Sequence, residues 1–219
     1  MKHNMIKGII FDLDGTLLDT VEDIKDSLNH ILAKNHFPIL TTEQVKKNLG
    51  NGGKALVRAS ILEKIEEEKL NKVFLEYSNY YNINNNIKTK PYPFILELLE
   101  TLKKENYLLA IVSNKDQSGV DTLNKNVFKG LIDVALGENK GVPLKPSPEV
   151  IYIALNQMGL THEEVLYVGD TEVDMQTAQN AQLKSVAVTW GFRKKEDLNV
   201  LNPDYMVDHP LEILEILKR

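Results

Sequence analysis

The chain has 219 residues, of which 42% are hydrophobic and 26% charged, as expected for one medium globular domain or a core with an insertion. The net charge is -5 and the Lys and Arg residues are scattered, which argues against nucleic acid or a membrane surface as a partner. There is no cysteine, so disulfides and thiolate metal sites are excluded. No apolar run approaches the roughly 18 residues of a membrane span, and the first apolar run is too short for a signal peptide. We therefore expect a soluble, cytoplasmic protein.

The N-terminal segment predicts a buried strand followed by a polar turn. Residues 6–10 form a short apolar run, and residues 11–20 continue it with the sequence FDLDGTLLDT. Asp12 and Asp14 lie two residues apart, so both carboxylates leave the strand end on the same side. Open α/β sheets hold ligands at this end of their strands. A calcium-binding EF-hand loop is excluded, because its sixth position requires Gly and Leu17 stands there.

The next segment predicts a group of helices. Apolar residues recur with helical spacing over residues 21–33, 55–62 and 68–81. Thr41 and Gln44 form a capping box that is expected to begin a further helix. The polar residues 82–90 and the following PYP at 91–93 predict a stiff linker. We expect residues 18–87 to form an all-helical cap domain, inserted into a core made of residues 1–17 and 88–219.

From residue 94 onward, helical and strand patterns alternate. Helices are expected at residues 94–104, 120–129, 149–158, 174–181 and 211–217, and strands at residues 107–112, 132–136, 165–168, 185–188 and 205–207. Ser147 precedes Pro148 and is expected to cap the helix that follows. Repeated βα units predict an α/β fold with a doubly wound, Rossmann-like parallel sheet and right-handed crossovers.

Three further polar clusters follow predicted strands: Ser113-Asn114, KPSP at residues 145–148, and GDTEVD at residues 169–174. Because the carboxyl ends of parallel strands share one edge of the sheet, these clusters are expected to converge with Asp12 and Asp14. Each cluster taken alone has a simpler interpretation. Ser113 could cap a helix, Lys145 could be solvated, and the acids of the last cluster could belong to the first turn of a helix.

Convergence of four carboxylates would require cations. Two carboxylates about 6 Å apart repel by roughly 3 kcal/mol at an effective dielectric constant of about 20. Several such pairs would remove much of a typical protein stability of about 5–15 kcal/mol. Lys145 supplies one cation, and the donor set, which contains oxygen only, favours Mg²⁺ as another.

Taken together, the motifs resemble those of a known family. DLDGTL at residues 12–17, Ser113-Asn114, Lys145-Pro146 and Gly169-Asp170-x-x-x-Asp174 are similar, in this order, to the four motifs of the haloacid dehalogenase superfamily of phosphohydrolases. The match spans almost the whole chain, and the helical insertion resembles the small cap domain of that superfamily. Residues 50–56 (GNGGKAL) and 188–193 (VTWGFR) are most similar to phosphoglycolate phosphatases and their relatives.

The resemblance implies a role for each motif residue. Asp12 would be the nucleophile that forms an aspartyl-phosphate, and Asp14 would protonate the leaving group and then activate water. Mg²⁺ would be held by Asp12, Asp170 and the backbone carbonyl of Asp14, with Asp174 in support. Lys145 would bridge Asp12 and the phosphoryl group. The substrate-binding residues implied by the resemblance are Ser113, the Asn114 amide, Thr16 and Gly52.

The implied activity is that of a Mg²⁺-dependent phosphatase for small phosphorylated metabolites, acting as a monomer or homodimer, with 2-phosphoglycolate as the leading substrate candidate. Alternatives on the same core are a phosphosugar mutase, an inorganic pyrophosphatase and a non-catalytic module that binds phosphorylated ligands. Lys54 and Arg58 lie four residues apart on a predicted helix, where they could pair with a substrate carboxylate or remain solvated. The glycine-rich stretch that begins at residue 50 is expected to be a flexible cap loop over the site.

Overall fold

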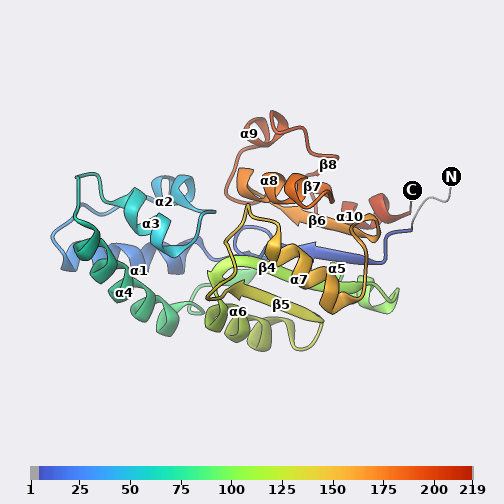
Figure 1. The fold of residues 1–219 in the computed structure, drawn as a ribbon, viewed down its shortest axis with the longest axis horizontal. Coiled ribbons are helices and arrows are strands. Elements are labelled where there is room, and N and C mark those ends of the chain that lie inside the picture. The colour runs from blue at the N-terminus through green and yellow to red at the C-terminus, as the bar shows by residue number, and fades with distance from the viewer. Residues whose placement is uncertain (1–4, 219) are drawn as a thin grey trace.

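The computed structural model describes residues 5–218 and is built around a six-stranded sheet (Figure 1). The strand order is β5-β4-β1-β6-β7-β8, and every neighbouring pair is parallel. The strands are β1 (Gly8–Phe11), β4 (Leu108–Asp116), β5 (Val134–Glu138), β6 (Val165–Gly169), β7 (Lys184–Val188) and β8 (Tyr205–Val207). The chain therefore adds strands on both sides of β1, which confirms the doubly wound sheet expected from the alternating pattern.

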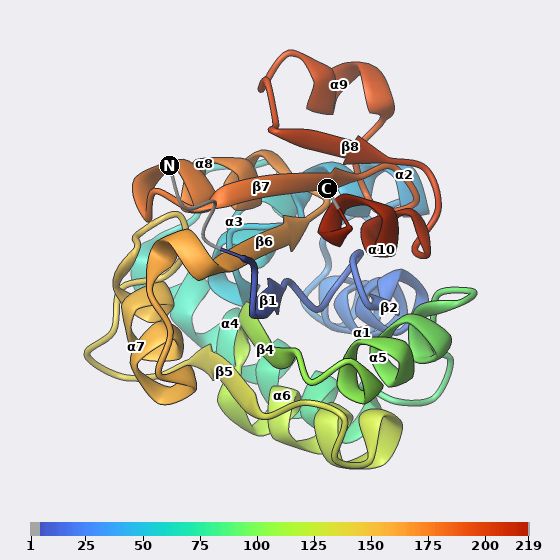
Figure 2. The ribbon, with the colours of Figure 1, turned by 90° about the vertical axis from the view of Figure 1, so that its right-hand side faces the viewer.

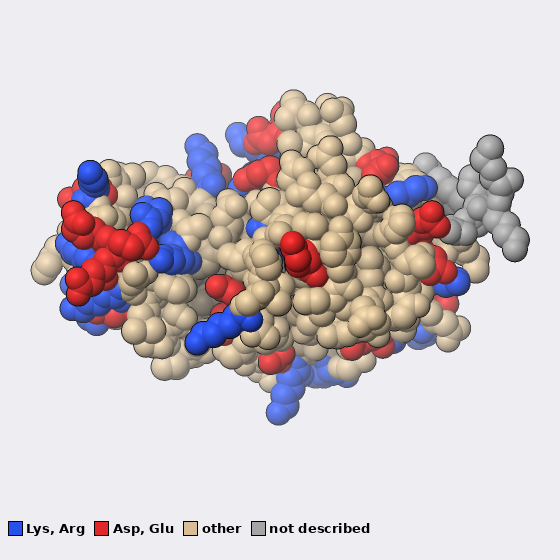
Figure 3. All heavy atoms as spheres, in the orientation of Figure 1, with Lys and Arg blue, Asp and Glu red and all other residues tan. Residues whose placement is uncertain are grey.

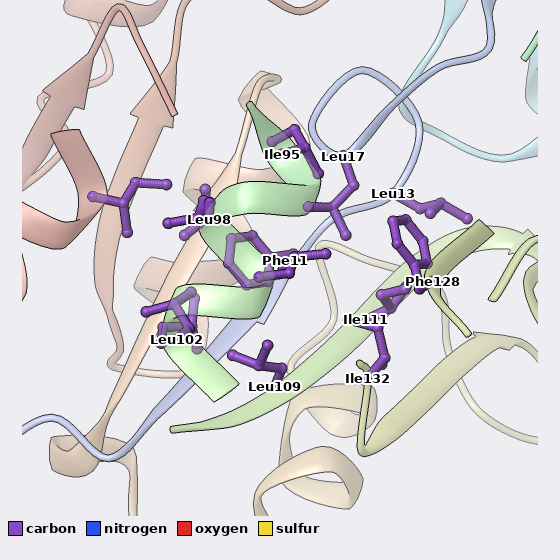
Figure 4. Close-up of a cluster of buried hydrophobic side chains, with 14 of the residues drawn as sticks. Phe11, Leu13, Leu17, Ile95, Leu98, Leu102, Leu109, Ile111, Phe128 and Ile132 are labelled. Atoms are coloured by element: carbon purple, nitrogen blue, oxygen red, sulfur yellow. The ribbon is translucent and has the colours of Figure 1, made fainter. Parts of the chain in front are cut away.

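Helices cover both faces of this sheet (Figure 2). One face carries α5 (Ile95–Lys104), α6 (Gln117–Leu123) and α10 (Glu212–Leu217), and the other carries α7 (Glu149–Met158) and α8 (Glu172–Asn180). Strand β1 packs against both helix layers. The side chains of Ile9 and Phe11 lie in the apolar cluster on the α5 face, and the side chain of Ile10 lies in the cluster on the α7 face. In Figure 4, Phe11 lies beside Leu98 and Leu102 of α5. Burial on both faces fixes the position of β1, and with it the acidic turn that follows.

Four helices form a second lobe, on the left of Figure 1. They are α1 (Val21–Lys34), α2 (Thr42–Asn48), α3 (Gly53–Ser60) and α4 (Glu67–Asn84). The apolar side chains of this lobe form one cluster, which Phe192 of the core joins and in which Leu28, Val45 and Leu70 are almost completely buried. The capping box of Thr41 and Gln44 begins α2, as predicted. The lobe is therefore held together by its own packing as well as by its attachment to the sheet.

Two short strands join the lobe to the sheet. β2 (Leu18–Asp19) and β3 (Lys90–Pro91) pair in antiparallel fashion. Close to this pair, the buried carboxylate of Asp23 accepts backbone N–H groups of residues 87, 88 and 89 at 2.8 to 3.0 Å. Residues 82–93, which were predicted as a stiff linker, therefore begin as the end of α4 and contain β3 near their end. Hydrogen bonds to Asp23 hold the residues between these two elements.

Some elements differ from the sequence prediction. Ser147 does not cap α7: Pro148 occupies the cap position, and the Ser147 hydroxyl instead bonds the carboxylate of Glu149. Strand β4 continues through Ser113 and Asn114, which were expected to follow it. The helix expected at residues 120–129 is α6 followed by a π-helical turn (Asn124–Phe128). Helix α9 (Lys195–Asn199) was not predicted, because its five residues are too few for an apolar repeat.

The surface carries charges of both signs. On the face drawn in Figure 3, a group of acidic side chains at the outer end of the helical lobe has basic side chains beside it. Within residues 5–218, no helix combines the length and apolar character needed to cross a membrane.

Candidate active site

A cavity of about 490 Å³ opens between the sheet and the helical lobe, at the carboxyl ends of β1 and β4. The strand arrows in Figure 1 point toward this junction. The core contributes charged and polar groups to the cavity wall, including Asp12, Asp14, Ser113, Asn114, Lys115, Lys145 and Asp174. The lobe contributes mainly apolar and aromatic groups, including Ile24, Leu56, Phe74, Tyr77 and Tyr81. One side of the cavity is therefore suited to charged chemistry and the other to holding the remainder of a ligand.

Asp12 lies at the end of β1 and is held by Lys145. The Lys145 ammonium donates to Asp12 Oδ1 at 2.8 Å and to Asp174 Oδ1 at 2.8 Å. It also lies 2.9 Å from the hydroxyl of Tyr167, a fully buried residue of β6. Lys145 is itself buried, so each of its three N–H donors has an oxygen partner within the protein. This arrangement fixes one oxygen of Asp12.

Asp170 and Asp174 come from the turn between β6 and α8. Asp174 Oδ2 accepts the backbone N–H and the hydroxyl of Thr171, in a capping box that begins α8. Asp170 is completely buried and accepts only neutral donors, the Thr16 hydroxyl at 2.9 Å and the Phe192 N–H at 2.7 Å. Gly15 has φ of 95°, and a Cβ there would lie 2.4 Å from Asp170 Oδ2. Only glycine therefore permits this close approach of the two turns.

These acids fit a divalent metal ion. Asp12, Asp170 and Asp174 are buried, and each offers a carboxylate oxygen such that the three atoms lie within 4.8 Å of one another. Within residues 5–218, Asp170 has no ion pair, so its buried charge has no protein cation in contact. An oxygen-only donor set of this kind suits Mg²⁺ better than zinc or copper.

The electrostatics of the cluster follow from burial and from Lys145. Burial, with repulsion from Asp174 and Asp14, raises the pKa of Asp12 to about 7 although Lys145 opposes the shift. Burial also raises the pKa of Asp170, and repulsion from the other two acids adds to it. Burial acts to raise the pKa of Asp174 as well, but Lys145 and the surrounding hydrogen bonds outweigh it and the pKa is lowered. Burial disfavours the Lys145 ammonium, yet Asp12 and Asp174 together hold its pKa well above the usual value.

Asp14 faces the same cavity and is paired with Lys115, a residue that the sequence motifs did not single out. The Lys115 ammonium lies 2.9 Å and 3.0 Å from the two carboxylate oxygens of Asp14. It also donates to the hydroxyl of Tyr81, on α4 of the helical lobe. The position of Lys115, directly after Ser113-Asn114 at the end of β4, was the signal available in the sequence.

The expected phosphate-binding residues lie at the cavity wall. Ser113 is buried there, and its hydroxyl oxygen accepts the backbone N–H of Lys115 at 3.2 Å. The side-chain amide of Asn114 donates to the carbonyls of Gly50 and Lys145, both at 3.0 Å, and its oxygen accepts the Lys145 N–H. Asn114 therefore links the loop before α3 and the loop that carries Lys145 to β4. Gly52 also lines the cavity, at the N-terminal end of α3.

Three residues of the predicted set do not reach the cavity wall. Thr16 is buried and supports Asp170 through its hydroxyl. Lys54 and Arg58 share a helix face as expected, but both pair with the exposed carboxylate of Glu67. The residues lining the cavity include none of the three. In this structure Lys54 and Arg58 therefore form surface ion pairs with Glu67, outside the cavity wall.

Comparison with known proteins identifies the class to which this fold and site belong. A model of the haloacid dehalogenase-like hydrolases matches residues 9–188, so the chain belongs to this hydrolase family. Its relatives include the phosphoglycolate phosphatase of Aquifex aeolicus, 33% identical over 218 residues that make up 97% of this chain and 97% of the relative. The N-acetylmuramic acid 6-phosphate phosphatase of Pseudomonas aeruginosa is 28% identical over 225 residues, covering 100% of this chain and 98% of the relative.

The fold agrees with this assignment. The crystal structure of a predicted phosphoglycolate phosphatase from Haemophilus somnus superposes with a TM-score of 0.89 at 28% identity, and the match covers 96% of this chain and 97% of that one.

Proposed function

We propose that this hydrolase is a Mg²⁺-dependent phosphatase of small phosphate monoesters, with Asp12 as nucleophile. The observation that carries the proposal is the placement of Asp12 at the cavity wall, with one oxygen held by Lys145 and a second carboxylate, Asp14, facing the same space. A nucleophile and a separate acid–base group at one cavity are what a two-step transfer through a covalent intermediate requires.

In the first step, an oxygen of Asp12 attacks phosphorus, and the bond from phosphorus to the ester oxygen breaks. Asp14 gives a proton to that oxygen, so the alcohol leaves neutral and Asp12 carries the phosphoryl group. In the second step, Asp14 takes a proton from water, whose oxygen attacks phosphorus and releases inorganic phosphate from Asp12. Lys145 holds the reacting carboxylate throughout, and Ser113 and Asn114 bind the oxygens of the phosphoryl group.

Asp12 and Asp170, with Asp174 in support, are the residues proposed to hold Mg²⁺. The ion when bound would neutralise charge on the phosphoryl oxygens and on the buried acids. The complete burial of Asp170, whose hydrogen-bond donors among residues 5–218 are the neutral Thr16 hydroxyl and Phe192 N–H, supports this assignment.

We propose residues 18–87 as a cap over a core made of residues 1–17 and 88–219. The separate apolar cluster of the helical lobe and the paired strands β2 and β3 at its base support this division. Tyr77 and Phe74 of α4 would then contact the part of the substrate that does not react.

The names of the relatives make 2-phosphoglycolate the first substrate candidate. A second candidate is a phosphorylated amino sugar, favoured by the relative from Pseudomonas aeruginosa and by a cavity of about 490 Å³ that exceeds the needs of a two-carbon acid. The cavity wall also lacks Lys54 and Arg58, the two cations that could have paired with a substrate carboxylate.

The test is phosphate release from a panel containing 2-phosphoglycolate, N-acetylmuramic acid 6-phosphate, other phosphosugars and pyrophosphate, with Mg²⁺ or with EDTA. We expect release that requires Mg²⁺ and is lost in Asp12→Asn, while the variant keeps the wild-type circular dichroism spectrum. Absence of release from every compound, or substantial release by Asp12→Asn, would contradict the proposal. Isomerisation of a phosphosugar without net release would indicate a mutase.

A further inference from the structure

Lys115 forms a bridge between the two lobes that ends on the proposed acid–base residue. Its ammonium contacts both carboxylate oxygens of Asp14, which belongs to the core, and the hydroxyl of Tyr81, which belongs to the helical lobe. The Lys115 side chain is only 5% exposed, and its ammonium also lies 4.6 Å from the centre of the Tyr81 ring. Both partners of Lys115 line the same cavity.

We propose that Lys115 and Tyr81 are positioning residues, through which the helical lobe sets the orientation of the Asp14 carboxylate. The inference rests on the proposed function, because it takes Asp14 as the acid–base group. The lobe would then act on turnover as well as on substrate binding, since Asp14 is held in one orientation only while Tyr81 is in place.

The bonding of Lys115 distinguishes this role from direct substrate binding. An ammonium has three N–H donors, and three oxygens surround this one. No donor is left for a carboxylate or hydroxyl of a substrate unless Asp14 or Tyr81 gives up its bond. Lys115 therefore acts through Asp14.

The surroundings of the bridge are suited to holding it in place. Tyr81 is 7% exposed and stacks on Tyr77, with ring centres 5.6 Å apart and an interplanar angle of 6°. On the core side, the Lys115 side chain passes Gly119, where an added Cβ would lie 3.4 Å from it. Rotation of either side chain would break packing as well as hydrogen bonds, so the bridge has one well-defined geometry.

Other contacts also cross from lobe to core. Asn114 donates to the Gly50 carbonyl, and Arg193 donates to the carbonyls of Lys46 and Leu49. These contacts reach α2 and the loop before α3, whereas the Tyr81 contact leads through one ammonium to a reacting carboxylate. The contacts of Asn114 and Arg193 hold the lobe in place, whereas the contact of Tyr81 can also influence the chemical step.

The test compares Lys115→Met and Tyr81→Phe with the wild type, using Tyr80→Phe as the matched control. Tyr80 precedes Tyr81 on the same helix, but it stacks on His30 and is outside the cavity wall. We expect kcat to fall at least about tenfold in Lys115→Met and about three- to tenfold in Tyr81→Phe, with KM changed less than about threefold. Tyr80→Phe should stay within about twofold of the wild type.

A second readout excludes a merely structural effect. With p-nitrophenyl phosphate the leaving group needs no proton, so Asp12 can still be phosphorylated, whereas the later attack by water still needs a correctly placed Asp14. We therefore expect Lys115→Met to release a burst of about one p-nitrophenolate per enzyme molecule and then turn over slowly, as Asp14→Asn should also do.

Three results would overturn the inference in an active wild-type enzyme: a rise in KM at unchanged kcat, slow turnover without a burst, or wild-type kinetics in both variants. The first result would make Lys115 a substrate-binding group, and the second would give it a structural role. If the wild type itself releases no phosphate from any ester, the proposed function fails, and the variants are not needed to reach that conclusion.

Discussion

At the scale of single residues, the buried acids of the site are stabilised in different ways. Asp12 and Asp174 share the ammonium of Lys145, whereas Asp170 is completely buried with only neutral hydrogen-bond donors. A buried charge without a counterion costs stability, and a bound cation removes that cost. Replacing Asp170 should therefore weaken metal binding strongly while changing the stability of the metal-free protein little.

We predict that Asp170→Asn changes the free energy of unfolding in EDTA by less than about 1 kcal/mol, because the lost repulsion offsets an imperfect hydrogen bond. In the wild type, Mg²⁺ at 100 times its Kd should add about 2.7 kcal/mol, and in the variant this gain should be largely absent. Urea unfolding with EDTA and along a Mg²⁺ titration measures both quantities.

Lys145→Met provides the contrasting variant, because it leaves two buried carboxylates without their shared cation. It should destabilise the protein in EDTA by about 3–5 kcal/mol.

If the stability of Asp170→Asn rises with Mg²⁺ as much as that of the wild type does, the assignment of Asp170 as a metal ligand is contradicted.

At the scale of elements, the loop before α3 approaches the core beside the cavity, where the Gly50 carbonyl accepts the side-chain amide of Asn114. Gly52 has φ of 84°, and an added Cβ would lie 3.3 Å from the Asn114 carbonyl oxygen and 3.3 Å from Leu144. Gly130 has a similar φ of 91°, but nothing lies within 4 Å of an added Cβ. Alanine would therefore have a strained backbone at either position, but only at position 52 would its methyl group meet neighbouring atoms.

We predict that Gly52→Ala and Gly130→Ala each lose about 1–2 kcal/mol of stability from the left-handed backbone. Only Gly52→Ala should lose activity, by at least about threefold, because its added methyl group would displace the loop before α3 away from β4. Thermal unfolding and steady-state kinetics on both variants provide the comparison. Equal activity in the two would mean that the loop tolerates displacement and has no part in closing the site.

The sequence predicted the larger elements well and the short ones poorly, for physical reasons. Helix α1 buries apolar residues at helical spacing, and strand β6 is a continuous buried apolar run; both patterns are visible in one sequence. β2 and β3 have two residues each and exist because they pair with one another across about 70 residues of chain, which no local pattern records. Ser147 had the right residue order for a cap, but its hydroxyl bonds Glu149 instead.

The same limit applies to the site. The strand-end motifs placed Asp12, Asp14, Lys145, Asp170 and Asp174 at one edge of the sheet, because parallel topology fixes that edge. Lys115 and Tyr81 were missed, since their contact depends on how the helical lobe sits on the core. Lys54 and Arg58 share a helix face as expected, but helical spacing alone cannot tell whether that face turns to the cavity or to Glu67.

At the scale of the whole molecule, the groups proposed to react lie on the sheet side of the cavity, and the helical lobe contributes most of its apolar wall. The helices on the sheet pack in apolar clusters of the core, whereas the helical lobe has a cluster that Phe192 of the core also joins. Beside the cavity, hydrogen bonds from Asn114 to Gly50 and from Lys115 to Tyr81 also link the two lobes. In this arrangement, the residues proposed to react and the residues proposed to select the substrate lie on different lobes. The chemical claim can therefore be tested without knowing the physiological substrate.

The most direct measurement is to quench the enzyme with acid during turnover of an ester that the panel identifies and to reduce the product with borohydride. Reduction converts an aspartyl-phosphate to homoserine, which mass spectrometry locates in the digested chain. Our account predicts homoserine at position 12, dependent on substrate, and none at position 14. Active enzyme with homoserine at position 14, or with no homoserine at position 12 in either the wild type or Asp14→Asn incubated with p-nitrophenyl phosphate, would contradict the assignment of Asp12 as the nucleophile.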